Sequence, residues 1–326
     1  MGERKKVGLA LSGGGARGLA HIGVLKILEK NRIPIDFISG TSMGAFVGAI
    51  YSAEPNAKKL EKDFLDKPWK NAFDYNLFPS QGLIKGDKIE RWLEKQIDDI
   101  EFKDLRIPLF VTAFDLKSKR EIIFNKGNVA EAVRASISLP GIFVPVENKG
   151  RLLVDGGVVD PIPSEVLTKA GADIVIVVNV NSIHDKDPIM GEIATKKRDS
   201  KNNSNILKTF TSSIQREGAI LAEYDLVNKK IDLIVNVYIE EIGTLEFDKI
   251  NSAIRAGELA AKKSIGEIKK LVGQSIFESI VGKKTAENIG KIVEPLKDLA
   301  KSAGLGNVAS PVKEISGRID SIKNKK

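Results

Sequence analysis

The chain has 326 residues, of which 42% are hydrophobic, so it can bury a large core in one large domain or two ordinary ones. It contains no cysteine, which excludes disulfides and thiolate metal sites. Its formal net charge of +8 suits an anionic partner, but aromatic residues make up only 6% and do not interleave with the basic ones, so we expect no nucleic acid partner.

The sequence offers no segment that would span a membrane or direct secretion. Its first apolar run, residues 7–11, is too short for the core of a signal peptide, and no later run approaches about 18 apolar residues. We therefore expect a cytoplasmic protein.

Two strand-turn-helix units open the chain. We predict a strand over 7–11, a glycine-rich turn and a helix over 18–31, then a strand over 35–40 and a helix over 43–53. The following residues, 54–104, are predicted to be polar and helical, apart from one aromatic stretch. That stretch contains Trp69, Phe73, Tyr75 and Phe78 between two prolines, a pattern typical of a packed surface excursion and less often of a substrate-facing lid.

Strands and helices continue to alternate in the second half. Further strands are expected over 107–116, 120–125, 151–157, 172–181 and 231–239, and helices over 128–141, 163–172, 206–227 and 247–272. The strand over 172–181 is almost continuously apolar, as in a parallel strand buried on both faces. A polar loop is expected over 184–205. The alternation predicts an α/β sandwich.

The end of the chain differs in composition from the rest. We predict a main domain over 1–270 and an extension over 271–326 that holds about half of the positive excess. Within it, "IGKIVEPLKDLAK" sets five apolar residues on one helical stripe opposite lysines. That stripe suits a helix docked on the main domain or one lying at a membrane surface, and a disordered tail is the third alternative. The extension therefore permits peripheral membrane association.

A serine between two glycines follows the second predicted strand. Gly40 and Gly44 flank Ser42 at the Gly-x-Ser-x-Gly spacing of a nucleophile elbow. The strand-turn-helix setting would project the hydroxyl from a sharp turn, so Ser42 is the candidate nucleophile. The alternative is that Ser42 only caps its helix.

A glycine-rich segment, "SGGGARG", follows the first predicted strand. Gly13, Gly14 and Gly15 can turn their backbone amides into one concavity, and such donors stabilise the oxyanion that forms when a hydroxyl attacks an ester. With Gly18 the segment also fits the dinucleotide pattern G-x-G-x-x-G, but the ribose-binding acid should end the second strand, where the serine turn stands instead. A P-loop is disfavoured because no lysine follows Gly18.

A serine nucleophile needs a base, and three residues are candidates. His21 lies one turn inside the first helix and is expected to pack beneath the glycine loop. His184 follows a buried strand and would complete the chain order of an α/β-hydrolase triad, but it opens the most polar loop of the sequence. Asp155 ends a predicted strand, where open α/β sheets bind ligands, and Gly156 and Gly157 leave its carboxylate approachable; a plain Asp-Gly turn is the alternative.

A carboxylate is a weak base for an alcohol when its pKa is near 3.9. Partial burial would raise that pKa, and an oxyanion hole would lower the barrier. We therefore prefer the aspartate, and keep the His184 triad and the dinucleotide site as alternatives.

Four ordered motifs resemble those of the patatin-like phospholipases, specifically the bacterial branch similar to the catalytic domain of neuropathy target esterase. They are "GGGARGLAHIGVL", "GTSMGA", "RASISLPGIFVPVE" and "LLVDGGVVDPIP". The resemblance is strong over residues 5–182 and continues more loosely to about 262, whereas the tail from about 270 does not match.

This resemblance implies a three-layer α/β/α sandwich with a mainly parallel central sheet, and hydrolysis of lipid acyl esters without a metal or other cofactor. Ser42 falls in the nucleophile position and Asp155 in the aspartate position of a Ser-Asp dyad. The turn at Gly13, Gly14 and Gly15 would form the oxyanion hole. Arg17 belongs to the motif without an assigned role, and no catalytic histidine is implied.

Overall fold

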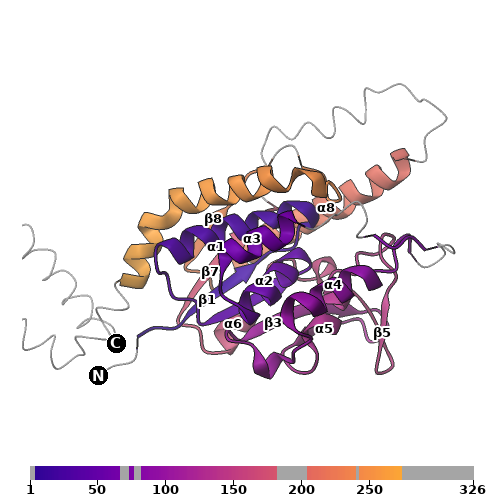
Figure 1. Cartoon of the computed structure of the whole chain (residues 1–326), viewed down its shortest axis with the longest axis horizontal. Coiled ribbons are helices and arrows are strands. Elements are labelled where there is room, and N and C mark those ends of the chain that lie inside the picture. Colours follow the sequence, from indigo (N-terminus) through magenta and orange to yellow (C-terminus); the bar gives the residue numbers. More distant parts are fainter. Residues whose placement is uncertain (1–3, 67–72, 77–81, 182–203, 240–241, 274–326) are drawn as a thin grey trace, which may run out of the picture. The chain divides into compact units, whose positions relative to one another are not determined.

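The computed structural model describes residues 4–66, 73–76, 82–181, 204–239 and 242–273 (Figure 1). Residues 6–266 form one compact unit and the two ends of the chain form another. The first unit contains the sheet and every site residue discussed below. The predicted extension over 271–326 lies, from residue 274 onward, outside the described residues.

A single eight-stranded sheet forms the centre of this unit. Its order is β5-β6-β3-β2-β1-β7-β8, with β4 also paired to β3. The parallel strands are β1 (Val7–Leu11), β2 (Phe37–Thr41), β3 (Leu109–Asp115), β7 (Ile174–Asn179) and β8 (Leu233–Asn236). The antiparallel additions are β4 (Arg120–Phe124), β5 (Val146–Asn148) and β6 (Arg151–Asp155).

Helices connect the strands and cover the sheet. They are α1 (Ala20–Lys30), α2 (Met43–Ala53), α3 (Ala57–Leu65), α4 (Asp87–Ile97), α5 (Val129–Ser136), α6 (Glu165–Lys169) and α8 (Ser204–Asn228), followed by a helix over 250–273. Short 3-10 turns include η1 (Gly15–Leu19), η4 (Gly156–Val158) and η5 (Phe247–Lys249).

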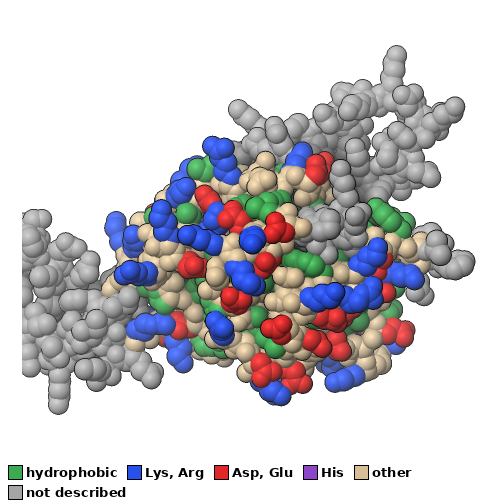
Figure 2. Space-filling model, in the orientation of Figure 1, with side chains coloured by type: hydrophobic (Ala, Val, Ile, Leu, Met, Phe, Trp, Pro, Cys, Tyr) green, Lys and Arg blue, Asp and Glu red, His purple; other side chains and the backbone are tan. Residues whose placement is uncertain are grey.

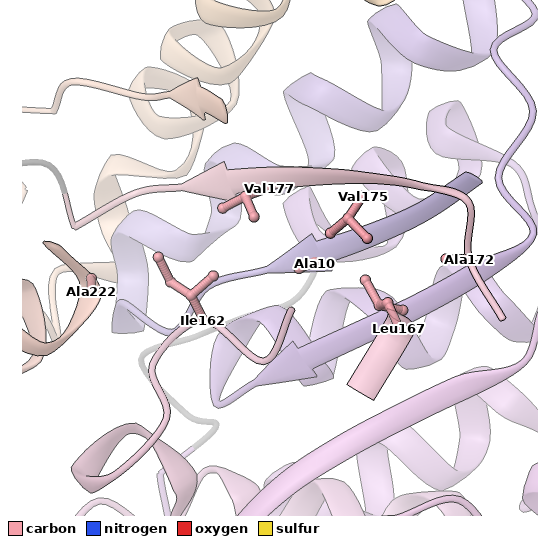
Figure 3. Packing of buried hydrophobic residues seen from close by; sticks show 7 residues of the cluster. All are labelled: Ala10, Ile162, Leu167, Ala172, Val175, Val177 and Ala222. Atoms are coloured by element: carbon pink, nitrogen blue, oxygen red, sulfur yellow. The ribbon is translucent and has the colours of Figure 1, made fainter. Parts of the chain in front are cut away.

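Both faces of the sheet are buried under helices. On one face, residues of β1, β7, α6 and α8 form a cluster (Figure 3). This cluster consists of Ala10, Ile162, Leu167, Ala172, Val175, Val177 and Ala222. On the other face, Gly48 of α2 packs against Leu11 and Ile38. The prediction of an α/β fold with a mainly parallel central sheet is therefore confirmed.

A few sequence-based expectations differ from the structure or fall outside it. Strand β5 was not predicted, because three residues are too few to show a period. Trp69, Phe78 and most of the predicted loop over 184–205 lie outside the described residues. On the face shown in Figure 2, basic and acidic side chains are intermixed, so this face is not a uniform basic surface.

Two glycines let α1 cross the helix over 250–273 at close range. A β carbon added to Gly257 would lie 1.9 Å from the Ala20 carbonyl oxygen, and one added to Gly23 would lie 1.9 Å from that of Ile254. Neither position has room for a side chain. The crossing therefore fixes the start of α1, directly after the glycine loop.

The feature that builds the site is an edge of β3 shared by two strands. β2 pairs with its first half, placing Thr41 opposite Thr112, and β6 pairs with its second half in the opposite direction, placing Asp155 opposite Ala113. β4 overlaps both partners along β3, so it must occupy the other edge. Strands β2 and β6 thus run toward each other and end at neighbouring positions, which we call the β2–β6 junction.

Candidate active site

Ser42 occupies a strained turn between β2 and α2. Its backbone has φ 55° and ψ −123°, a conformation that side-chain-bearing residues rarely adopt. The flanking glycines are sterically required: a β carbon on Gly44 would lie 2.2 Å from the Leu11 carbonyl oxygen, and one on Gly40 would lie 2.5 Å from the Ala45 nitrogen. The Gly-x-Ser-x-Gly spacing therefore permits the close approach of β1, β2 and α2.

Asp155 ends β6 on the other side of the β2–β6 junction. Only 2% of it is exposed, and its carboxylate accepts hydrogen bonds from the Ser42 side chain and, at 2.8 Å, from the Gly157 N–H. Burial raises the pKa of Asp155 to about 6, although both hydrogen bonds act to lower it. The carboxylate is consequently a stronger base than an exposed aspartate.

Steric constraints also explain why glycine occupies the two positions after Asp155. A β carbon on Gly156 would lie 2.5 Å from the Thr112 carbonyl oxygen, so β3 leaves no room for a side chain there. One on Gly157 would lie 3.1 Å from the Asp155 carboxylate. Gly157 therefore leaves the space directly beside the carboxylate free of a side chain.

The glycine loop runs beside the serine. A β carbon on Gly13 would lie 3.5 Å from the Ser42 β carbon, which places the loop next to the hydroxyl. Gly14 and Gly15 have φ of 151° and 55°, and added β carbons would lie 2.5 Å from Val180 and 2.3 Å from the Thr244 carbonyl oxygen. Only glycine fits either position.

The three amides of this loop are not equivalent. The Gly13 N–H donates to the Pro161 carbonyl at 3.0 Å, so it is already committed within the fold. The N–H groups of Gly14 and Gly15 have no acceptor among the residues that the structure describes. The donors open to a ligand are therefore those of Gly14 and Gly15.

Buried polar side chains hold the loop from behind. Arg17 donates to the Asn181 side-chain oxygen at 3.2 Å, and the Asn181 amide donates to the Gly13 carbonyl at 3.0 Å. His21 Nε2 donates to the Ser12 carbonyl at 2.8 Å, and burial lowers the pKa of His21 to about 4. His21 is thus a neutral support beneath the loop, as expected, and its donating nitrogen cannot accept the serine proton.

These elements surround one pocket with about 900 Å³ of empty space, including its open mouth. Ser42, Asp155 and the glycine loop form one side. The other walls are apolar and come from α2, α4, the segment after α5 and the segment before the last helix. They consist of Met43, Phe46, Ile89, Ile137, Leu139, Phe143, Leu245 and Phe247. Such a pocket suits a ligand with a long apolar part and one reactive polar group.

The structure brings most of the predicted residues together. Arg17 and Gly157 line the same pocket as Ser42 and Asp155, whereas Gly18 lies behind it, packed on Met43. His184 falls outside the described residues. Among the described residues, no group of three or more His, Asp or Glu side chains could hold a metal ion.

The structure does not supply the acid that a dinucleotide site needs. Asp36 precedes β2, and its carboxylate accepts the Val7 N–H at 2.7 Å, at the start of β1 and not at the end where the glycine loop begins. The end of β2 carries the serine turn instead. The dinucleotide alternative therefore lacks its ribose partner.

Sequence reasoning missed several pocket residues. Asn181, Thr244 and Phe247 carry no motif of their own, although Asn181 follows the apolar strand β7, where site residues are common. The Thr244 carbonyl accepts the Ala16 N–H at 2.8 Å, so the segment before the last helix is tied to the glycine loop. Phe73, from the predicted aromatic stretch, packs on Phe247 with ring centroids 5.5 Å apart.

Comparison with known proteins gives a consistent result. The model of the family described as "Patatin-like phospholipase" matches residues 9–168. The chain is 30% identical over 281 residues to Lysophospholipase nte1 of Aspergillus fumigatus and 31% identical over 297 residues to Lysophospholipase NTE1 of Coccidioides immitis. These alignments cover 81% and 86% of this chain, but only 18% and 19% of those proteins.

Among solved structures, VipD from Legionella pneumophila is similar with a TM-score of 0.49 and 14% identity, over 99% of this chain and 80% of that one. The chain spans about a fifth of the length of the curated relatives it matches. Within the part of the chain that the structure describes, none of the helices is long and apolar enough to cross a membrane.

Proposed function

Because this chain belongs, through residues 9–168, to the patatin-like phospholipase family, we propose that it is a serine acyl hydrolase that cleaves fatty acids from phospholipids, lysophospholipids or related lipid esters. The observation that carries the proposal is the buried pairing of Ser42 with Asp155 at the wall of a largely apolar pocket. The catalytic pair would be these two residues alone.

The first half of the reaction would form an acyl-enzyme. Asp155 accepts the Ser42 proton while the serine oxygen attacks the ester carbonyl, which gives a tetrahedral oxyanion. Collapse of this intermediate breaks the ester bond, and the leaving alcohol takes the proton from Asp155. The pKa of about 6 suits both transfers, because a group with a pKa near neutral pH can both accept and return a proton.

The oxyanion would lie against the glycine loop. Gly14 and Gly15 supply the two N–H groups without an internal acceptor, and the loop passes beside the Ser42 side chain. One such donor contributes about 3–4 kcal/mol to the transition state. This assignment narrows the predicted oxyanion hole from three glycines to two, with Gly13 as its anchor.

The second half would release the fatty acid. Water attacks the acyl carbonyl, Asp155 takes a proton from that water, and the serine oxygen leaves and recovers the proton. The apolar walls would hold the acyl chain throughout. Phe46 lies one turn beyond Ser42 on α2 and stacks on Trp92 with ring centroids 5.8 Å apart, so it forms a firm part of that wall.

The experiment is intact-mass measurement after incubation with a long-chain fluorophosphonate, followed by lipid hydrolysis assays. One adduct on the wild type and none on Ser42→Ala is expected, with Asp155→Asn inactive and His184→Ala active. Loss of turnover in His184→Ala as well as in Asp155→Asn would establish the triad instead. Absence of any adduct, together with tight dinucleotide binding by calorimetry, would replace the hydrolase with the nucleotide-binding alternative.

The place of action is also a proposal. We infer a cytoplasmic enzyme that meets its lipid at the inner membrane surface through the basic residues 271–326. Liposome co-sedimentation with anionic vesicles should weaken when these residues are deleted and when salt is raised. Unchanged vesicle binding by the truncated chain would show that residues 271–326 do not mediate contact with the membrane.

A further inference from the structure

We propose that the end of α5 positions both members of the catalytic pair, and that Ser136 is a positioning residue for the nucleophile. This inference rests on the proposed function. It concerns residues that hold the backbone of the site and not groups that touch the substrate.

The hydroxyl of Ser136 bridges the nucleophile turn to the sheet. It accepts a hydrogen bond from the Ser42 N–H at 2.8 Å and donates one to the Thr112 carbonyl at 2.6 Å. Ser136 is completely buried, so water cannot take over either bond. One oxygen atom therefore fixes the position of the Ser42 backbone relative to β3.

The point of attachment is the β2–β6 junction itself. Thr112 is the residue of β3 opposite the end of β2, and the next residue lies opposite Asp155. Two residues after Ser136, the Ser138 carbonyl accepts the Asp155 N–H at 3.0 Å. The segment from Ser136 to Ser138 thus holds the backbone of the nucleophile and that of its base.

This segment is braced in turn by a buried arginine. Arg134 Nη1 donates to the Ser138 hydroxyl at 2.6 Å, and that hydroxyl donates to the Arg134 carbonyl at 2.8 Å. The Arg134 guanidinium also donates to the carbonyls of Lys85 and Val144. The turn after α5 is therefore fixed to two further segments of the chain.

The backbone of Ser42 needs such support. Its positive φ is unfavourable for a residue with a side chain, and it persists only where the surroundings impose it. Without the Ser136 hydroxyl, the Ser42 N–H would lose its acceptor and the turn would relax. A displacement of about 1 Å at a nucleophile lowers its reactivity by about 100-fold.

Ser136 is not among the residues lining the pocket, so its loss should change reactivity and leave substrate binding intact. The test is Ser136→Ala, with the rate of fluorophosphonate labelling of Ser42 and the kcat and KM for a soluble acyl ester as readouts. We expect labelling rate and kcat to fall by about 10- to 100-fold, with KM within twofold of the wild type.

Two matched controls separate positioning from the loss of a buried hydroxyl. Ser39 of β2 is equally buried and donates to the Pro163 carbonyl at 2.6 Å, so Ser39→Ala removes a similar bond without touching the turn. Ser52 is also fully buried, and its hydroxyl has no partner among the described residues. Both variants should keep kcat and labelling within about threefold of the wild type.

A second variant covers a failure of Ser136→Ala to fold. Ser136→Cys keeps a group of similar shape that is a weaker acceptor and donor, so a fall of at least about fivefold in kcat with unchanged KM is expected. If the wild type is active and the Ser136 variants match Ser39→Ala in kcat and labelling, the positioning role is refuted and the hydrolase stands. A wild type that neither reacts nor hydrolyses esters refutes both.

Discussion

Replacing Asp155 with asparagine should abolish turnover and at the same time stabilise the fold above neutral pH. The carboxylate is buried at the β2–β6 junction with two hydrogen bonds and no neighbouring cation contributing to its pKa. Asparagine has nearly the same shape and can still accept the Gly157 N–H, but it carries no charge. The substitution therefore isolates the cost of burying the charge.

The magnitude follows from the pKa of Asp155. Below pH 3.8 the carboxyl group is neutral in the folded and the unfolded chain, and burial of charge costs nothing. As the pH rises through about 6, the folded chain must hold an ionised group that prefers water, and stability is lost. A folded pKa of about 6 against 3.8 unfolded corresponds to about 3 kcal/mol at pH 8.

The assay is thermal and urea unfolding of the wild type and Asp155→Asn at pH 4 and pH 8. At pH 8 the variant should be more stable by about 3 kcal/mol, or roughly 6 °C in Tm, since 1 kcal/mol shifts a domain of this size by about 2 °C. At pH 4 most of that advantage should have disappeared, because the wild-type carboxyl is then protonated in the folded chain.

Asp115, a carboxylate whose pKa is lowered instead of raised, provides the control. The hydroxyl of Ser118 and three backbone N–H groups hold the pKa of Asp115 at about 2. Asp115→Asn should therefore destabilise the protein at pH 8, and its effect should shrink in strong acid. If Asp155→Asn lowers stability by the same amount at both pH values, burial does not raise the pKa of Asp155 and the assignment of the base loses its physical ground.

Three further outcomes follow from the same structure. Ester hydrolysis should fall about tenfold for each pH unit below 6, because the proposed base Asp155 can accept the serine proton only when it is ionised; a flat pH–rate profile would contradict this. Gly257→Ala should lower the free energy of unfolding, measured in urea, by about 3 kcal/mol, because its β carbon would meet the Ala20 carbonyl. Gly266→Ala, on an open face of the same helix, should be neutral or stabilising by about 0.5 kcal/mol. His21→Gln should destabilise the protein less at pH 4 than at pH 6.5. Between these pH values the histidine of the unfolded wild type is protonated while the buried His21 of the folded chain stays neutral, so the wild type loses stability as the pH falls. Parallel stability curves for the two proteins would show that His21 is not held neutral.

The serine turn and the buried strand β7 could be predicted from the sequence because each is encoded within one short segment. Glycines at fixed offsets from Ser42 specify a turn in which strand and helix nearly touch, and the distances at Gly40 and Gly44 show the reason. The apolar run of β7 specifies a strand buried on both faces. Such signals need no knowledge of the rest of the chain.

What could not be predicted depends on contacts between distant segments. The Gly13 N–H is hydrogen-bonded to the carbonyl of Pro161, which lies almost 150 positions away in the sequence. No local pattern distinguishes this amide from those of Gly14 and Gly15. The pocket wall around Phe247 likewise depends on a distant contact, the hydrogen bond from the Ala16 N–H to the Thr244 carbonyl. The sequence shows which residue types are present, and the tertiary fold decides which of their groups remain open to a ligand.

The pairing of Ser42 with Asp155 illustrates this difference most directly. From the sequence, Asp155 is expected at the carboxyl end of a strand in an open α/β sheet, as the partner of the serine turn. The structure reaches the same proximity by another route, since β6 is antiparallel and meets β2 end to end on one edge of β3. A junction of this kind lies inside the sheet, under α5, and leaves only 2% of Asp155 exposed. The same arrangement that brings Asp155, the proposed base, to Ser42 thus also raises the pKa of Asp155, which a pair built on an exposed sheet edge would not achieve.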